Sequence, residues 1–207
     1  MKKKIVAFIL VFALALALGI GATMAWLTAE SGKVVNTFTV GNITLELTEK
    51  DATKDADGTL KKDYKILPGA TAEKEPKLTV GAGSEKCYLY ACVTNDVKIG
   101  NDVVATPNIS TEWVPVGTKG NATVYRYNDV IDASDEAVAK SVFTEVKYSE
   151  TITQSKAHLD ALTNKTIVVQ GYAHQSEHIS ETEGDTSVAD SAACAYFKVD
   201  AIVTPAN

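Results

Sequence analysis

Residues 87–93, CYLYACV, decide the fold class, because both faces of this β-like run are apolar. In an extended strand, alternate side chains point to opposite faces of the sheet. One face would carry Tyr88, Tyr90 and Cys92, and the other Cys87, Leu89, Ala91 and Val93. A short apolar run without a polar face is typical of a strand that is covered on both sides. We therefore expect residues 87–93 to form the central strand of a sheet.

Further β-like segments lie on both sides of this run. Residues 43–48, ITLELT, alternate apolar and polar side chains, which indicates a half-buried strand, and residues 166–173, TIVVQGYA, form a second strong strand. Shorter strands are expected at 77–80, 112–116, 123–127, 142–148 and 196–204. Short helices are expected at 154–162 and 186–195, with a brief helical turn at 132–140. Many short strands with frequent turn signals and few helices predict an antiparallel β-sandwich.

The N-terminus has the three parts of an export signal. Lys2 to Lys4 are followed by the apolar run of residues 5–18, and Thr23-Met24-Ala25 provides a cleavage region. The apolar stretch, counted to Ala25, is also long enough to remain as a membrane anchor. Cleavage between Ala25 and Trp26 is favoured, because small residues crowd its end and no positive cluster follows. We expect a signal peptide at 1–25, a mobile segment at 26–40 and a β-sandwich domain at 41–207.

The charge of the chain limits its partners. The formal net charge is −6, and removal of residues 1–25 takes away three lysines and no acid, which leaves −9. A surface this acidic argues against nucleic acid or an anionic membrane as a partner. Membrane contact is expected only through the signal segment, before it is cleaved.

The cysteine content is too low for a disulfide framework. Cys87, Cys92 and Cys194 are three in number, and the first two lie on opposite faces of the expected central strand, so a bridge between them within a regular strand is implausible. Two interpretations stay open. All three are buried thiols, or Cys194 forms one bridge and leaves a spare thiol.

One motif points to a metal. His174-Gln175-Ser176-Glu177-His178 fits the H-x-x-E-H pattern of inverted zinc proteases, which requires both histidines on one face of a helix. Here the motif directly follows a β-run, which argues against a zinc site. The sequence contains no nucleophile elbow, P-loop or dinucleotide fingerprint. We therefore expect no catalytic residues, no metal, no cofactor and no enzymatic activity.

Two N-terminal motifs, GATMAWLTA at 21–29 and VNTFTVGNITL at 35–45, resemble those of the exported TasA and camelysin-like proteins of Gram-positive bacteria. The later motifs ILPG at 66–69, PKLTV at 76–80 and GSEKCYLY at 83–90 are similar to those of clostridial relatives. The resemblance implies a jelly-roll-like β-sandwich and cleavage by a SipW-type signal peptidase. It also implies secretion to the extracellular matrix of a biofilm or to the cell surface, and fibres formed by donor-strand exchange. Camelysin-like members have been classed as metallopeptidases, but this chain has no H-E-x-x-H.

The segment after the cleavage site suits the role of a donor strand. A strand without a covalent or hairpin constraint at its start can pair with the sheet edge of another chain, with side chains such as Val35, Phe38 and Val40 packing against it. Head-to-tail exchange of this kind builds open filaments. We therefore expect a secreted structural protein that self-associates into fibres. The alternatives are a monomeric or membrane-tethered surface adhesin or binding module and, with less support, a camelysin-like metallopeptidase.

Overall fold

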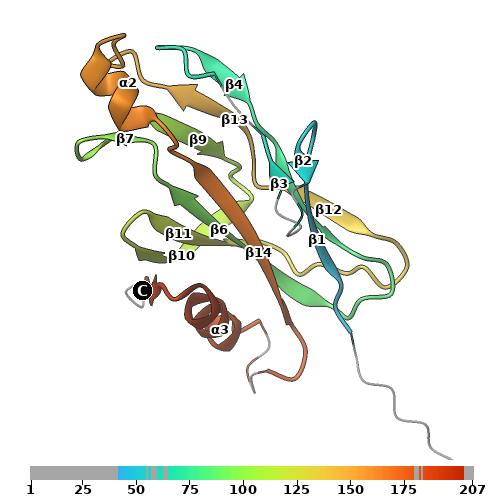
Figure 1. The fold of residues 1–207 in the computed structure, drawn as a ribbon. Coiled ribbons are helices and arrows are strands. Elements are labelled where there is room, and N and C mark those ends of the chain that lie inside the picture. The colour runs from blue at the N-terminus through green and yellow to red at the C-terminus, as the bar shows by residue number, and fades with distance from the viewer. Residues whose placement is uncertain are drawn as a thin grey trace, which may run out of the picture. The chain divides into compact units, whose positions relative to one another are not determined.

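Two layers of antiparallel strands enclose the hydrophobic core (Figure 1). The computed structural model describes residues 42–54, 56, 60–62, 65–179, 182 and 184–202. The signal peptide at 1–25, the cleavage junction at Ala25 and Trp26, and the donor-strand residues Val35, Phe38 and Val40 lie outside the described residues. In the described part of the chain, no helix is both long and apolar enough to cross a membrane.

The first layer has the strand order β14-β6-β11-β10-β15. These strands cover Ile167–Gln175, Cys87–Asn95, Ala122–Tyr127, Trp113–Lys119 and Asp200–Ala201 respectively. The strand predicted at 87–93 is β6, and it lies between β14 and β11. Its first seven residues are all buried. The prediction of a central strand is therefore confirmed.

The second layer consists of β1-β5-β12 and β4-β13-β9. These strands cover Leu45–Glu49, Pro76–Val80 and Val138–Ser141, and then Thr71–Glu73, Phe143–Tyr148 and Ala105–Ile109. The two groups join into one continuous layer through two backbone hydrogen bonds. The N–H of Lys74 donates to the carbonyl of Thr144 at 3.1 Å, and the N–H of Val142 donates to the carbonyl of Pro76 at 3.0 Å. Two small hairpins, β2–β3 (Thr53–Lys54, Leu60–Lys61) and β7–β8 (Lys98–Ile99, Asp102–Val103), complete the described strands. The antiparallel β-sandwich is as expected.

The core between the layers is formed by the inward faces of the strands. Leu89 and Ala91 of β6 pack in one buried cluster with Leu78, Phe143 and Val146 of the second layer. At the side of β14 the layers come close at Gly171. A Cβ atom on that residue would lie 2.3 Å from Leu78 Cδ2, so only glycine allows this approach.

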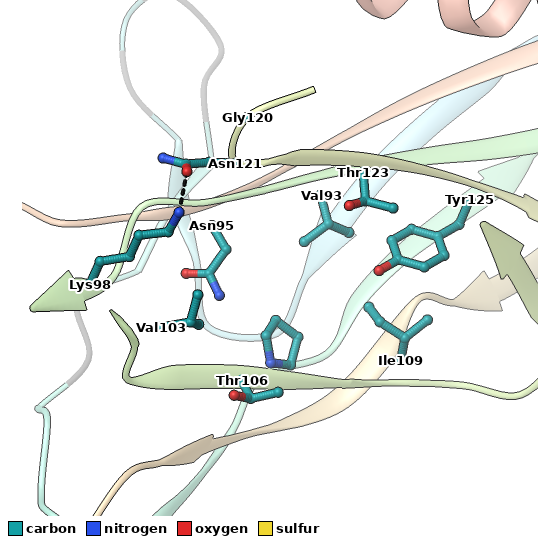
Figure 2. Close-up of a pocket in the computed structure, with 11 residues that line it drawn as sticks. Val93, Asn95, Lys98, Val103, Thr106, Ile109, Gly120, Asn121, Thr123 and Tyr125 are labelled. Carbon is teal, nitrogen blue, oxygen red and sulfur yellow. Dashed lines mark hydrogen bonds between the residues drawn. The ribbon is translucent and has the colours of Figure 1, made fainter. Parts of the chain in front are cut away.

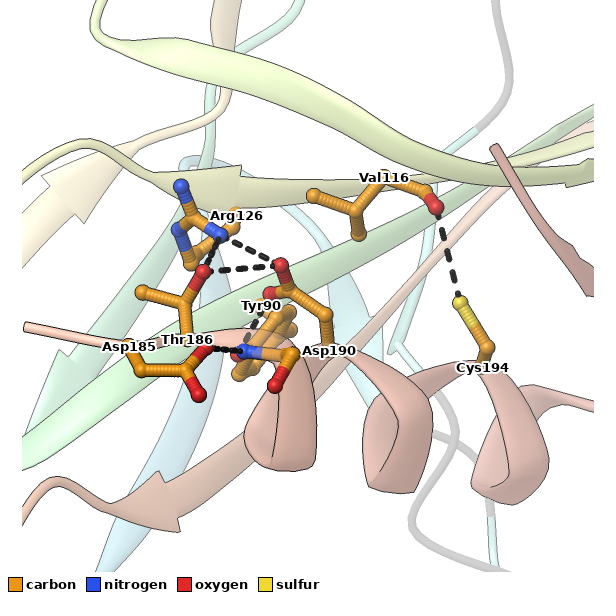
Figure 3. Close-up of polar contacts among 8 residues, drawn as sticks. Tyr90, Val116, Arg126, Asp185, Thr186, Asp190 and Cys194 are labelled. Carbon is orange, nitrogen blue, oxygen red and sulfur yellow. Dashed lines mark hydrogen bonds and ion pairs between the residues drawn. The ribbon is translucent and has the colours of Figure 1, made fainter. Parts of the chain in front are cut away.

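Helix α3, Ser187–Phe197, covers the outer face of the first layer (Figure 1). Its fully buried residues Ala189 and Ala193 are small, which allows close packing against Tyr90 and Cys92 of β6. Arg126 Nη1 of β11 lies 2.5 Å from Asp190 Oδ2, and the hydroxyl of Tyr90 donates to Asp190 Oδ1 at 2.8 Å (Figure 3). The helix thus covers the second, outward apolar face of the central strand.

Helix α2, Lys156–Leu162, lies where a helix was expected, and the hydroxyl of its N-cap Ser155 accepts a hydrogen bond from the N–H of His158. Two smaller expectations are wrong. Residues 132–140 form no helical turn, because Val138–Ser141 pair with β5 as β12 and this pairing overrides the local alanine content. Of the strand predicted at 196–204, the described part forms a strand only at Asp200–Ala201, because Tyr196 and Phe197 complete α3 and Lys198 caps it with φ 59°; residues 203 and 204 lie outside the described residues.

Candidate functional site: an unprotected sheet edge

Strand β14 forms one border of the first layer, and among the described strands β6 is its only neighbour in the sheet. The N–H of Ser176 donates to the carbonyl of Lys86 at 2.9 Å, and that of Asp96 donates to Thr166 at 2.9 Å. In an antiparallel pair, hydrogen-bonded residues alternate with residues whose N–H and C=O groups point away. The even-numbered residues of β14 therefore bond to β6, and the odd-numbered residues direct their N–H and C=O groups to the free edge.

The odd-numbered residues of β14 also face the core. The side chains of Ile167, Val169 and Ala173 pack against the buried cluster but are only partly buried. Leu45 and Leu47 of β1, which lies close to β14 on this side of the sandwich, are likewise only partly buried. The β14 edge therefore combines a row of backbone groups without strand partners in the described part of the chain with an incompletely covered apolar border.

This edge lacks the features that protect sheet edges in natural proteins. Such edges are shielded by charged side chains, by proline, by bulges or by being very short. None of the nine residues of strand β14, IVVQGYAHQ, is an aspartate, glutamate, lysine, arginine or proline. Its register with β6 runs without a shift from Ile167 to Gln175. A long, regular and uncharged edge of this kind is a template for the addition of another strand.

The edge of β9, at the opposite side of the second layer, is protected. Pairing of β9 with β13 leaves the backbone groups of Ala105 and Pro107 on the free edge. Pro107 has no N–H to donate. The carbonyl of Ala105 already accepts a hydrogen bond from Asn95 Nδ2 at 2.7 Å. Strand addition at β9 would therefore lack two of the backbone bonds that it needs.

A hollow of about 270 Å³ lies beside β9, between the two layers (Figure 2). Val93, Ile109 and Tyr125 line its apolar part. Its polar groups are engaged with one another: Lys98 Nζ bonds Asn121 Oδ1, and Asn95 bonds the backbone of Ala105 and Val97. The hollow therefore does not present a set of unsatisfied groups converging on a ligand.

The remaining edges are short, charged or interrupted. Strand β1 has five residues and carries Glu46 and Glu49, and Glu49 pairs with Lys74 at 2.8 Å. Strand β15 has two residues, one of them Asp200, and β10 contains Pro115. Among the described strands of both layers, β14 alone offers a long edge without charge or proline.

The three cysteines are free and buried, and Cys87 and Cys92 lie on opposite faces of β6 as expected. Burial raises the pKa of Cys87 to about 11, and it also raises the pKa of Cys92 and Cys194. The thiolate is the reactive form, so these thiols are poor nucleophiles near neutral pH. The interpretation of three buried thiols fits the structure, and the bridge through Cys194 is not formed.

The H-x-x-E-H motif does not lie on a helix. His174 is in β14, where its Nδ1 lies 2.9 Å from the carbonyl oxygen of Gln175, and His178 lies beyond the strand with φ 59°. The shared helical face that the zinc chemistry requires is therefore not formed. Among the described residues, no group of histidine, cysteine and acidic side chains is arranged to hold a metal ion.

No family model, curated protein or solved structure matches the chain.

The sequence predicted β14 as a strand but did not identify its edge as a site. The available signal was the uncharged, proline-free composition of residues 167–175. Its meaning depends on β14 being a border strand, which only the strand order reveals.

Proposed function

We propose that this protein is a secreted structural protein that assembles into fibres of an extracellular matrix or cell surface. In this assembly, the segment of residues 26–40 of one copy adds as a strand to the β14 edge of another copy. The observation that carries the proposal is the nine-residue edge without charge or proline. The resemblance to TasA and camelysin-like proteins supports the same function, with a SipW-type signal peptidase releasing the segment by cleavage after Ala25.

The start of β1 is fixed independently of the residues before it. The N–H of Thr44 donates to Ser84 Oγ at 3.1 Å, and Ser84 Oγ donates to the carbonyl of Gly81 at 2.6 Å. The N–H of Glu85 donates to the carbonyl of Asn42 at 3.1 Å. These bonds hold β1 from Asn42 onward, so the preceding segment can pair with another copy without loss of the first strand.

Two kinds of contact would favour such pairing. A backbone hydrogen bond contributes about 1 kcal/mol net, and several would form along β14. Burial of a phenylalanine or valine side chain contributes about 1.5–3 kcal/mol, and residues 34–40, VVNTFTV, carry such side chains at positions 34, 35, 38 and 40. Ordering the segment costs about 1–2 kcal/mol per residue, so the pairing needs burial of these apolar side chains in addition to the backbone hydrogen bonds.

Electron microscopy of the exported protein tests the function. We expect filaments formed by a chain whose N-terminal residue, determined by sequencing, is Trp26. A chain that is cleaved at this position but stays monomeric at high concentration would contradict the fibre function and favour a surface binding module. A chain that retains residues 1–25 would instead indicate a membrane tether.

A further inference from the structure

We infer that two copies of this chain pair through their β14 edges and form an antiparallel dimer, whose two-fold axis passes between the two Gly171 residues. Each copy then protects the sheet edge of the other. The dimer goes beyond the proposed function, because it uses only described residues of the sandwich and forms whether or not the chain builds filaments.

The edge of β14 is complementary to a second copy of itself. The odd-numbered residues direct their N–H and C=O groups to the free edge, and in an antiparallel pair such residues lie opposite one another and exchange both hydrogen bonds. When the two Gly171 residues are opposite, Ile167 lies opposite Gln175 and Val169 lies opposite Ala173. All nine residues of β14 are then paired. The contact uses the same patch on both copies, so it closes as a dimer.

Charges just beyond the ends of β14 are complementary in this arrangement. Lys165 lies two residues before the strand and Glu177 two residues after it. With Gly171 at the axis, Lys165 of each copy lies opposite Glu177 of the other, so this ion pair forms twice. Within one copy, Lys165 Nζ lies 4.0 Å from Asp96 Oδ2, and Glu177 Oε1 lies 3.9 Å from Lys86 Nζ. Each end of the dimer therefore carries a row of alternating charges.

The ion pairs select this register from the alternatives. A different register that keeps the edge groups paired must be shifted by two residues or a multiple of two. A shift in one direction places Lys165 opposite Gln175, and a shift in the other places Glu177 opposite Ile167. Both shifts lose the two ion pairs and shorten the paired length. Exposed ion pairs contribute little to affinity, so they determine the register, while backbone bonds and apolar contacts hold the dimer.

The outer face of β14 supplies one of these apolar contacts. The side chain of Val168 is 44% exposed in the single copy, and in the dimer it lies opposite His174 of the other copy. The ring of His174 lies 6.3 Å from that of Tyr172, which stacks on Tyr196 at 4.8 Å. Val168 therefore meets the end of an aromatic row. His174 and Glu177, which form no zinc site, both face the second copy.

The core side of β14 is covered at the same time. Ile167, Val169 and Ala173 are only partly buried in the single copy. In the dimer, Val169 and Ala173 lie opposite one another on the core side, and Gly171 adds no side chain at the axis. The first layers of the two copies become one continuous sheet. The dimer thus covers the long edge that has neither charge nor proline.

The dimer and the proposed donor segment require the same backbone groups of β14. One edge can therefore hold a second β14 or a donor strand, but not both. Filament formation would draw on copies that have left the dimer, and the dimer would be the form present at concentrations below filament formation.

Cross-linking between chains with one added cysteine tests the direction and register of the pairing. Val168→Cys and His174→Cys are made separately in the full mature chain and studied below the concentration at which filaments form. A short thiol–thiol cross-linker should join the two variants when they are mixed, because these positions lie directly opposite. Either variant alone should stay unlinked, because two copies of one position lie six residues apart, about 20 Å at 3.3 Å per residue.

The other outcomes of this experiment overturn the inference. Links within each variant alone, without links in the mixture, would show parallel pairing. The absence of links in every sample would show that the two edges do not meet. The native thiols are buried, so the unsubstituted chain should give no link. Filaments are detected separately by electron microscopy, so failure of the dimer and failure of the fibre function are distinguishable.

Charge reversal tests the register in a second way. One chain carries Lys165→Glu and another carries Glu177→Lys. Each variant alone places like charges opposite one another at both ends of the dimer, so its dissociation constant should rise roughly tenfold in sedimentation equilibrium. In a mixture of the two variants, opposite charges meet again at both ends. The mixed dimer should therefore form about as tightly as the unsubstituted one.

A matched pair of controls changes the net charge equally at the other border of the first layer. Lys119 of β10 and Asp200 of β15 are exposed there, so Lys119→Glu and Asp200→Lys should leave dimerisation unchanged, alone or mixed. Dimerisation of Lys165→Glu or Glu177→Lys alone as tight as that of their mixture would overturn the register. An unsubstituted chain that sediments only as a monomer would overturn the dimer itself.

Discussion

Removal of residues 26–40 from the mature chain is expected to abolish filament formation while leaving the β-sandwich folded. The first strand is held from Asn42 by its bonds to the turn at 81–86, so the fold does not need the deleted segment. The acceptor edge of β14 would remain intact but would have no donor. Sedimentation and electron microscopy should show no filaments, and the melting temperature should change little.

A matched pair of point substitutions distinguishes a loss of strand pairing from a general effect of changing the N-terminal segment. Phe38→Lys replaces an apolar side chain of the proposed donor by a charge, whereas Thr37→Lys places the same charge at the preceding position, which points to the opposite face of an extended strand. Loss of phenylalanine burial, about 2–3 kcal/mol, raises the concentration needed for assembly roughly thirtyfold to a hundredfold or more. We expect this increase for Phe38→Lys and a much smaller one for Thr37→Lys. Equal effects of the two substitutions would contradict pairing of this segment as an extended strand.

Ala173→Lys is expected to block assembly from the acceptor side. Ala173 lies on β14 with its backbone groups on the free edge and its side chain toward the core border. A lysine there must extend past the edge to keep its charge in water, and a charged side chain that points inward from an edge strand prevents strand addition. The variant chain should stay monomeric at concentrations at which the unsubstituted chain forms filaments.

Gln170→Lys is the control for this variant. Gln170 is on the same strand and exposed, but its side chain points to the outer face and its backbone groups bond to β6. The control adds the same charge and should assemble nearly normally. The two variants should also have similar circular dichroism spectra. Assembly of Ala173→Lys with unchanged efficiency would exclude β14 as the acceptor.

Mixing experiments can show that each variant loses one role only. Chains with Ala173→Lys keep an intact donor segment, and chains with Phe38→Lys keep an intact β14 edge. Neither should form filaments alone. A donor from the first can still add to the acceptor of the second, so an equimolar mixture should form short complexes that stop after one contact. Long filaments from the mixture would contradict a head-to-tail contact with one donor and one acceptor per copy.

The sandwich fold could be predicted from the sequence because its signals are local. The apolar run at 87–93 and the alternation at 43–48 report directly which faces of a strand are buried. The helix at 132–140 was wrong because alanine content is a weak local preference, and pairing of Val138–Ser141 with β5 outweighs it. The strand predicted at 196–204 starts too early, because Tyr196 and Phe197 belong to α3 and the strand begins only at Asp200.

The candidate site could be predicted only in part. The donor segment has a sequence signal, since residues 34–40 alternate and follow a cleavage region. The acceptor edge has no specific sequence signal. Whether a strand is central or at a border depends on contacts between residues far apart in the chain. Strands β6 and β14 are both uncharged and free of proline, yet among the described strands β6 has partners on both sides and β14 has a partner on one side.

Residue-resolved hydrogen exchange on the mature chain, compared between monomers and filaments, tests the pairing of residues 26–40 with β14 most directly. The N–H groups of Val169, Gly171 and Ala173 point to the free edge in the monomer, whereas those of the even-numbered residues already bond to β6. In filaments we expect the odd-numbered N–H groups to exchange roughly a hundredfold more slowly, while the even-numbered groups change little. Unchanged exchange at Val169, Gly171 and Ala173 in filaments, with new protection at β1 or β9 instead, would contradict this account.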